Sequence, residues 1–160
     1  MDKMYIRGSI YKQLVDELDK RTVRPVNRAM GEGSFETFKE VLDYSPIDTG
    51  RFRAAWRLTL DRPTRSTPKE PTPAQRSENI SGKDMFSSEL MAARAQANKS
   101  SQTFTIMKHK AIVLSNNVSY STSITKLSER NAGKMTSPEI ERFASSRMDD
   151  LIQSKLGKIK

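Results

Sequence analysis

The sequence predicts an α+β fold: a small antiparallel sheet flanked by N-terminal and C-terminal helices, with a long proline-rich loop. Three observations predict it. Apolar residues recur every three or four positions near both ends of the chain, as in amphipathic helices. Apolar and polar residues alternate at 56–61 and at 103–107, as in half-buried strands. Four prolines lie close together between those two stretches, at 63–73. We expect residues 1–160 to form a single domain.

The first helical pattern covers residues 9–23, with Ser9 as a plausible N-cap. Pro25 is expected to kink or end this helix, because proline lacks an N–H and disfavours a helical residue before it. Gly31 and Gly33 indicate a break. Ser34 is then expected to cap a second helix that carries Phe35, Phe38, Val41 and Leu42. The pattern leaves open whether one kinked helix or two cover this region.

The stretch 45–50, Ser-Pro-Ile-Asp-Thr-Gly, is a turn by composition. Pro46 stops the helical pattern. Asp48 is expected to accept backbone hydrogen bonds within the turn, and Gly50 to supply a φ that other residues avoid. The alternating strand 56–61 follows.

Residues 62–84 are polar and rich in proline, which excludes a central strand or a helix interior. We interpret this segment as an extended loop or arm inserted between strands. Residues 85–97 are rich in Ala, Leu, Met and Glu and are expected to form a short helix.

The second half of the chain returns to strand composition at 102–107, with a polar hairpin candidate at 108–110 and a buried-strand run at 111–114. Asn116 and Asn117 follow. Asparagine tolerates a positive φ, so the pair is expected to form a turn. The last helix is expected to begin with Ser137 as N-cap, Pro138 at the first helical position and Glu139 as an early acid. Its apolar side holds Ile140, Phe143, Met148, Leu151, Ile152 and Leu156.

Composition excludes several kinds of chemistry. There is no cysteine, which removes disulfides, thiol nucleophiles and thiolate metal sites. His109 is the one histidine, so a multi-histidine metal site is excluded. No apolar run approaches the ~20 residues that span a bilayer. We therefore expect a soluble chain, made in a cytoplasm, with no metal and no cofactor.

The chain is strongly basic, with 28 Lys and Arg against 19 Asp and Glu, a net charge of +9. No stretch is a dense block of Lys and Arg. A basic surplus permits contact with nucleic acid or with an acidic partner but does not choose between them. A basic nucleic-acid-binding module is therefore kept as an alternative function.

No catalytic constellation emerges from the residue types and their spacing. The triplet Asp48-Thr49-Gly50 is shared with aspartic proteases, but such a dyad needs two carboxylates close enough to share a proton, and here only a homodimer would supply them. A Ser–His pair would have to use His109, which we expect to be an exposed turn residue between two lysines. The chain is expected not to be an enzyme.

Two motifs carry a resemblance to a known group of proteins. Residues 45–56 closely resemble the signature of neck and tail-completion (head–tail joining) proteins of tailed bacteriophages, including the HK97-like neck family and the minor tail protein Z group. That signature runs Pro, Val or Ile, Asp-Thr-Gly, any residue, Leu or Phe, Arg, any residue, Ser or Ala, and Trp or Ile. The positions that carry the match are Pro46, Asp48, Thr49, Gly50, Arg53 and Trp56.

The second motif is a strand followed by two asparagines and a tyrosine, which in this chain are Asn116, Asn117 and Tyr120. The order of elements over most of residues 9–152 is also similar to the family's. The chain departs from the family at Ser119, where a proline is usual. It departs again after Tyr120, where an acidic and glycine-bearing segment is usual.

The resemblance implies a structural virion protein at the junction of head and tail, assembled in the cytoplasm of the bacterial host. Such proteins form rings, commonly hexameric, with a small sheet flanked by helices. The implied partners are further copies of the chain, the head connector or adaptor, and the tail terminator or tail tube. DNA would be a passenger in the lumen, and no membrane is implied. The arm 62–84 would then order against a neighbour.

Overall fold

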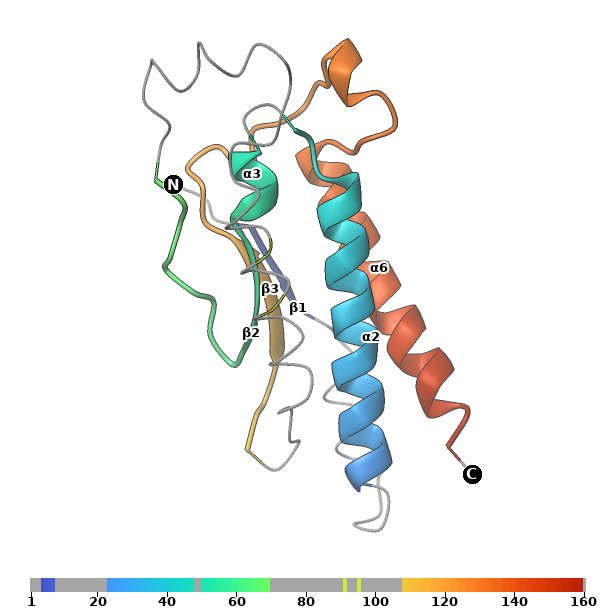
Figure 1. The fold of residues 1–160 in the computed structure, drawn as a ribbon. Coiled ribbons are helices and arrows are strands. Elements are labelled where there is room, and N and C mark those ends of the chain that lie inside the picture. The colour runs from blue at the N-terminus through green and yellow to red at the C-terminus, as the bar shows by residue number, and fades with distance from the viewer. Residues whose placement is uncertain are drawn as a thin grey trace.

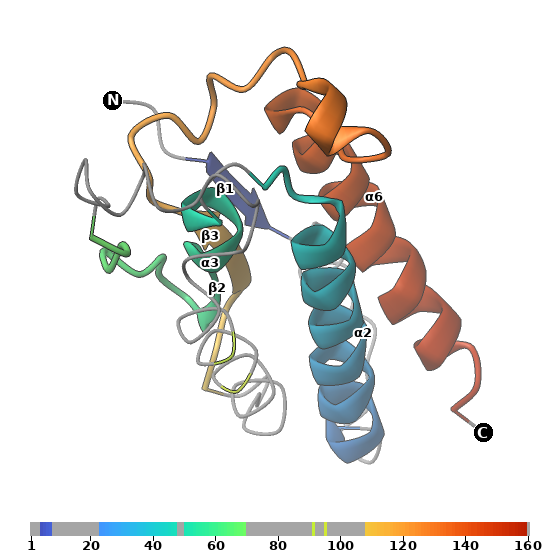
Figure 2. The same cartoon turned by 45° about the horizontal axis from the view of Figure 1, so that its top comes forward.

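The computed structural model describes residues 4–7, 23–47, 50–69, 91, 95 and 108–159. Its elements in chain order are β1 (Met4–Arg7), α2 (Val23–Tyr44), α3 (Arg51–Ala54), β2 (Trp56–Leu60), β3 (Ile112–Asn116), the 3-10 helix η3 (Glu129–Asn131) and α6 (Ser137–Leu156). Figures 1 and 2 show α2 and α6 side by side, with the sheet along one side of the pair. The predicted α+β class with a small antiparallel sheet is confirmed.

Within the described residues the sheet has three strands in the order β1-β3-β2, and both pairings are antiparallel. In the centre, all five residues of β3 are buried. Leu58 of β2 pairs with Leu114 of β3, and Trp56 pairs with Asn116. The strands expected at 56–61 and 111–114 are present, and the end of the second is later than expected because Asn116 still belongs to it. The strand expected at 102–107 lies outside the described residues, and β1 was not expected.

One continuous helix, α2, covers residues that were expected to contain a break. Pro25 lies in the first turn of α2 as the structure describes it. The N–H groups of a first turn have no partner within the helix, so proline loses no helical hydrogen bond there. Gly31 and Gly33 lie inside the helix and are buried. The expected cap, Ser34, instead donates its hydroxyl to the carbonyl of Met30 at 2.6 Å, so the predictions of a break and of a second cap were wrong.

A close approach between the two long helices explains Gly33. A Cβ added there would lie 2.8 Å from Ile152 Cγ1 and 3.1 Å from the Ile152 main-chain nitrogen of α6. Real Cβ atoms essentially never lie within 3.0 Å of such an atom. The glycine that suggested a break in the helix therefore marks a helix contact. Residues 9–22, which carry the first predicted helix, lie outside the described residues.

The helix α6 begins one residue away from its predicted start. Thr136 is the N-cap, and both its main-chain N–H and its hydroxyl donate to Glu139 Oε2, at 2.7 and 2.6 Å. The predicted cap, Ser137, instead forms hydrogen bonds with the preceding loop. Its N–H donates to the Ile124 carbonyl at 2.7 Å, and its hydroxyl accepts from the Ile124 N–H at 3.2 Å.

The hydrophobic core lies between the helix pair and the sheet. Its largest fully buried side chains are Trp56, Phe38, Met30, Leu42, Leu58, Leu114, Ile140, Met148, Ile152, Val26 and Val41. Burying one such side chain contributes about 1.5–3 kcal/mol. Ion pairs border the helix contact. Arg147 binds Glu40 through two nitrogens, at 2.7 and 2.8 Å, and Lys155 lies 2.7 Å from Glu36.

Two other predicted segments are only partly described. Residues 62–69 of the proline-rich arm form an extended segment that leaves β2 on the side away from α2 and α6 (Figures 1 and 2). Residues 70–84 lie outside the described residues. In the short helix expected at 85–97, the described Met91 and Ala95 are both helical.

Candidate functional site

The turn after α2 is held by hydrogen bonds to its side chains and main chain. The Ser45 hydroxyl donates to the Val41 carbonyl at 2.6 Å and accepts from the Trp56 indole Nε1 at 2.9 Å. Farther along, the Ile47 N–H donates to Asn131 Oδ1 at 2.7 Å. Because the indole of Trp56 is fully buried, its N–H needs this partner, and Ser45 supplies it.

The first motif continues from this turn into α3. Pro46 is buried, and Gly50 has φ 87°, the left-handed conformation that favours glycine. Its carbonyl accepts the first helical hydrogen bond, from Ala54, at 2.9 Å. Arg53 is half-buried on α3. The remaining two motif positions, Asp48 and Thr49, lie outside the described residues.

The second motif meets the first directly. Asn116 ends β3 with a fully buried side chain, and its Nδ2 donates to the Phe52 carbonyl at 2.8 Å. Its Oδ1 accepts from the Val118 N–H at 3.2 Å. The Tyr120 ring stacks on Phe52 with centroids 6.4 Å apart, and Phe52 lies edge-on to Trp56 at 5.9 Å.

The asparagines do not use the positive φ that was expected of them. Among the described residues other than glycine, only Asp61 has a positive φ, at 63°. Asn116 is a strand residue whose amide joins two segments. Asn117 donates its Nδ2 to the Thr64 carbonyl, which lies on the proline-rich arm. Their role is side-chain hydrogen bonding across the fold, which local turn propensity does not reveal.

The first motif holds the same arm. Arg51 is buried, and its Nε donates to the Pro68 carbonyl at 3.0 Å, while its guanidinium carbon lies 6.0 Å from the centre of the Tyr120 ring. Since Asn117 holds Thr64 in the same way, each motif binds one main-chain carbonyl of the arm. The two motifs thus form one structural unit from which the arm departs.

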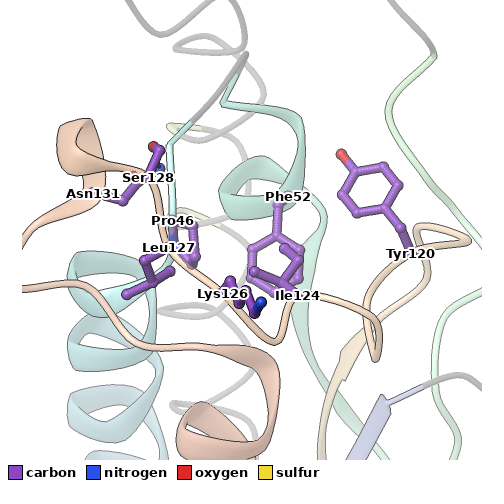
Figure 3. A pocket seen from close by; sticks show the side chains of 8 residues that line it. All are labelled: Pro46, Phe52, Tyr120, Ile124, Lys126, Leu127, Ser128 and Asn131. Atoms are coloured by element: carbon purple, nitrogen blue, oxygen red, sulfur yellow. Dashed lines mark hydrogen bonds between the residues drawn. The ribbon is translucent and has the colours of Figure 1, made fainter.

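A cavity of about 370 Å³ opens beside this unit, as Figure 3 shows. Its apolar lining comes from Pro46, Phe52, Ile124 and Leu127, and Tyr120, Lys126, Ser128 and Asn131 add polar groups. The described lining contains a cation and no carboxylate. Its apolar part is suited to seating an apolar side chain.

A corner at Asp61 was missed by the sequence analysis. Its Oδ1 accepts from the N–H groups of Lys110 and Ala111, and its Oδ2 lies 3.1 Å from His109 Nδ1. The Lys110 N–H, with His109 beside it, lowers the pKa of Asp61. His109 is thus half-buried and paired, which corrects the expectation of an exposed turn residue. An aspartate at a strand end, tolerant of left-handed backbone, was the available signal.

Comparison of the chain with protein families, with curated proteins and with solved structures finds no match in any of the three. Within the described ranges, no three His, Asp or Glu side chains gather closely enough to hold a metal ion. Neither α2 nor α6, the two long helices of the described part, is apolar enough to cross a membrane.

Proposed function

We propose that this chain is a structural virion protein of a tailed bacteriophage: a ring-forming neck or tail-completion protein that joins the head connector to the tail. Copies of the chain would form the ring, DNA would pass through its lumen, and the head connector or adaptor and the tail terminator or tube would flank it. It would act by assembly and without catalysis.

The observation that carries this proposal is the contact between the two motifs that resemble this family. Asn116 of the second motif donates to the Phe52 carbonyl of the first, although sixty-four residues separate them. Two unrelated chance matches would have no reason to share this hydrogen bond and the stacking of Tyr120 on Phe52, whereas two parts of one structural unit would.

The arm supports the proposal in a second way. It is held at Thr64 and Pro68 by side chains of the two motifs, so its direction of departure is set by the folded domain. A polar, proline-rich segment directed in this way is suited to ordering against a neighbouring subunit. A ring also buries surface that a small polar chain leaves exposed.

The test is the native mass, measured by light scattering coupled to size exclusion, with negative-stain electron microscopy of the same fractions. We expect a mass near six times 18.1 kDa and closed rings with a central channel. A strict monomer over the whole accessible concentration range, with no rings on the grid, would contradict the proposal. A dimer with pepstatin-sensitive proteolysis would instead favour the aspartic-protease interpretation.

A further inference from the structure

Five exposed cations lie on the arm that follows β2 and on the segment that precedes β3, spread along the length of these strands. The arm root, residues 61–69, carries Arg62, Arg65 and Lys69, and the segment 108–110 carries Lys108 and Lys110. Asp61 joins the two segments, because its carboxylate accepts from the Lys110 and Ala111 N–H groups and its own N–H donates to the Ala111 carbonyl at 2.8 Å. We name these five cations the basic edge.

The backbone of the arm root faces inward and leaves the cations outside. Three of its carbonyls accept hydrogen bonds from the folded domain: Arg62 from the Thr59 hydroxyl, Thr64 from Asn117, and Pro68 from Arg51. The side chains of Arg62, Arg65 and Lys69, each at an anchored residue or next to one, are exposed. The arm root is therefore a fixed support for the charges it carries.

The cations of the basic edge form no ion pairs within the part of the chain that the structure describes. There, Arg28, Arg147 and Lys155 each pair with a glutamate, whereas none of the five basic-edge cations lies within ion-pair distance of a carboxylate. The single acid of the two segments, Asp61, is occupied by main-chain N–H groups and by His109.

We propose that the basic edge binds the phosphate backbone of duplex DNA. Every exposed side chain in the two segments is a cation or a hydroxyl, since Ser66 and Thr67 are the other exposed residues. Lys, Arg, Ser and Thr are the side chains that contact phosphate oxygens. The centre of a protein interface is typically rich in aromatic and apolar side chains, and stacking on single strands needs an aromatic ring. The exposed residues of these two described segments include neither.

The inference does not rest on the ring, because a monomer would carry the same edge. The contact would be independent of sequence, since phosphates are the same at every base pair. It would also be strongly dependent on salt, because each neutralised phosphate releases counterions.

The experiment measures binding of the full chain to a fluorescent mixed-sequence duplex by anisotropy, between about 50 and about 200 mM salt. The test variant is R62Q/R65Q/K69Q. Its matched control is R24Q/R142Q/K158Q, which removes the same number of Arg and Lys charges from exposed positions on α2, on α6 and just after α6. A second test variant, K108Q/K110Q, probes the other segment. Melting curves of all three should match the parent chain.

We expect the test variant to bind at least about tenfold more weakly at the lowest salt. The slope of its log binding constant against log salt concentration should become shallower by about 3, near 0.9 for each phosphate that is no longer neutralised. The control should stay within about twofold, and a second, unrelated duplex should bind equally well. Equal effects in the test and control variants would overturn the proposal. So would absence of salt-dependent binding by the parent, or binding to polyglutamate as tight as to DNA. If the chain forms rings but does not bind DNA, the inference about the basic edge is overturned and the proposed ring stands. If the chain binds DNA as a monomer, the proposed ring is contradicted and the inference about the basic edge stands.

Discussion

The side-chain amide of Asn116 donates a 2.8 Å hydrogen bond to the main-chain carbonyl of Phe52, and both groups are buried. This bond joins the end of the central strand to the short helix α3. It is also the point at which the two family-like motifs become one unit.

Substituting Asn116→Ala removes the amide and leaves the Phe52 carbonyl without this donor in a buried position. We expect the free energy of unfolding to fall by about 1–3 kcal/mol, the cost of an unsatisfied buried polar group. The matched control is Ser119→Ala, at an exposed position three residues on, which should change stability by less than about 0.5 kcal/mol. Urea unfolding followed by circular dichroism measures both. Equal midpoints for the two variants would show that the bond contributes nothing.

The contact of Gly33 with Ile152 predicts an unusual response to alanine. In an open helix Gly→Ala stabilises by about 1 kcal/mol, but here the new Cβ meets Ile152 Cγ1 at 2.8 Å. We expect Gly33→Ala to lower stability by about 1–3 kcal/mol through overpacking.

Two further variants test this interpretation of Gly33. Gly157→Ala is the control, because its Cβ would meet ordinary van der Waals contacts and its φ is −62°. The double variant Gly33→Ala/Ile152→Ala should be destabilised by less than the sum of the two single effects, because the closest clash, with Ile152 Cγ1, disappears with that side chain. If the destabilisation of the double variant in thermal melts equals the sum of the two single effects, the clash with the Ile152 side chain is not what destabilises Gly33→Ala.

The bond between Trp56 and Ser45 gives a third prediction. Ser45→Ala leaves the buried indole N–H unpaired, and we expect stability to fall by about 1–3 kcal/mol. Trp56→Phe removes the indole N–H as well as volume. The cycle of single and double variants, followed by circular dichroism, should therefore show favourable coupling between the two residues. A coupling energy of zero would mean that the indole finds another acceptor.

The corner at Asp61 predicts a pH dependence. The Lys110 N–H first and then His109 lower the pKa of Asp61 below its unfolded value, which is near 3.9. The stabilising contribution is therefore fully present above the unfolded pKa and is lost as the pH falls through the folded pKa. Asp61→Asn keeps an oxygen acceptor and tolerates the left-handed backbone, but does not ionise. We expect the melting midpoint of the parent to fall more than that of Asp61→Asn between about pH 5 and about pH 3. Parallel pH curves would exclude Asp61 as the responsible group.

Local patterns predicted much of the fold. Periodicity predicted the alternating strand β2 and the buried strand β3. Pro46 predicted the end of α2, and capping chemistry predicted the start of α6 to within one residue. These signals are local, because helix and strand periods and cap preferences are set within a few residues. The left-handed Gly50 belongs to the same group.

The errors lie where distant contacts override local preference. Gly31 and Gly33 indicated a break because glycine is a poor helix former, but both are buried inside α2, and Gly33 packs against Ile152 of α6. The asparagine pair indicated a turn because asparagine tolerates positive φ, and their amides bind segments more than fifty residues away instead. No local pattern carries that information.

The fold class, the positions of most described elements and the two motifs could be predicted from the sequence, since each depends on residues close together in the chain. Contacts between distant segments make β3 the central strand, bring the two motifs together beside the arm and place five cations on two segments that Asp61 joins. The physical reason is that sheet order, side-chain hydrogen bonds and surface charge are set by which distant segments pack together, and packing is a property of the whole core.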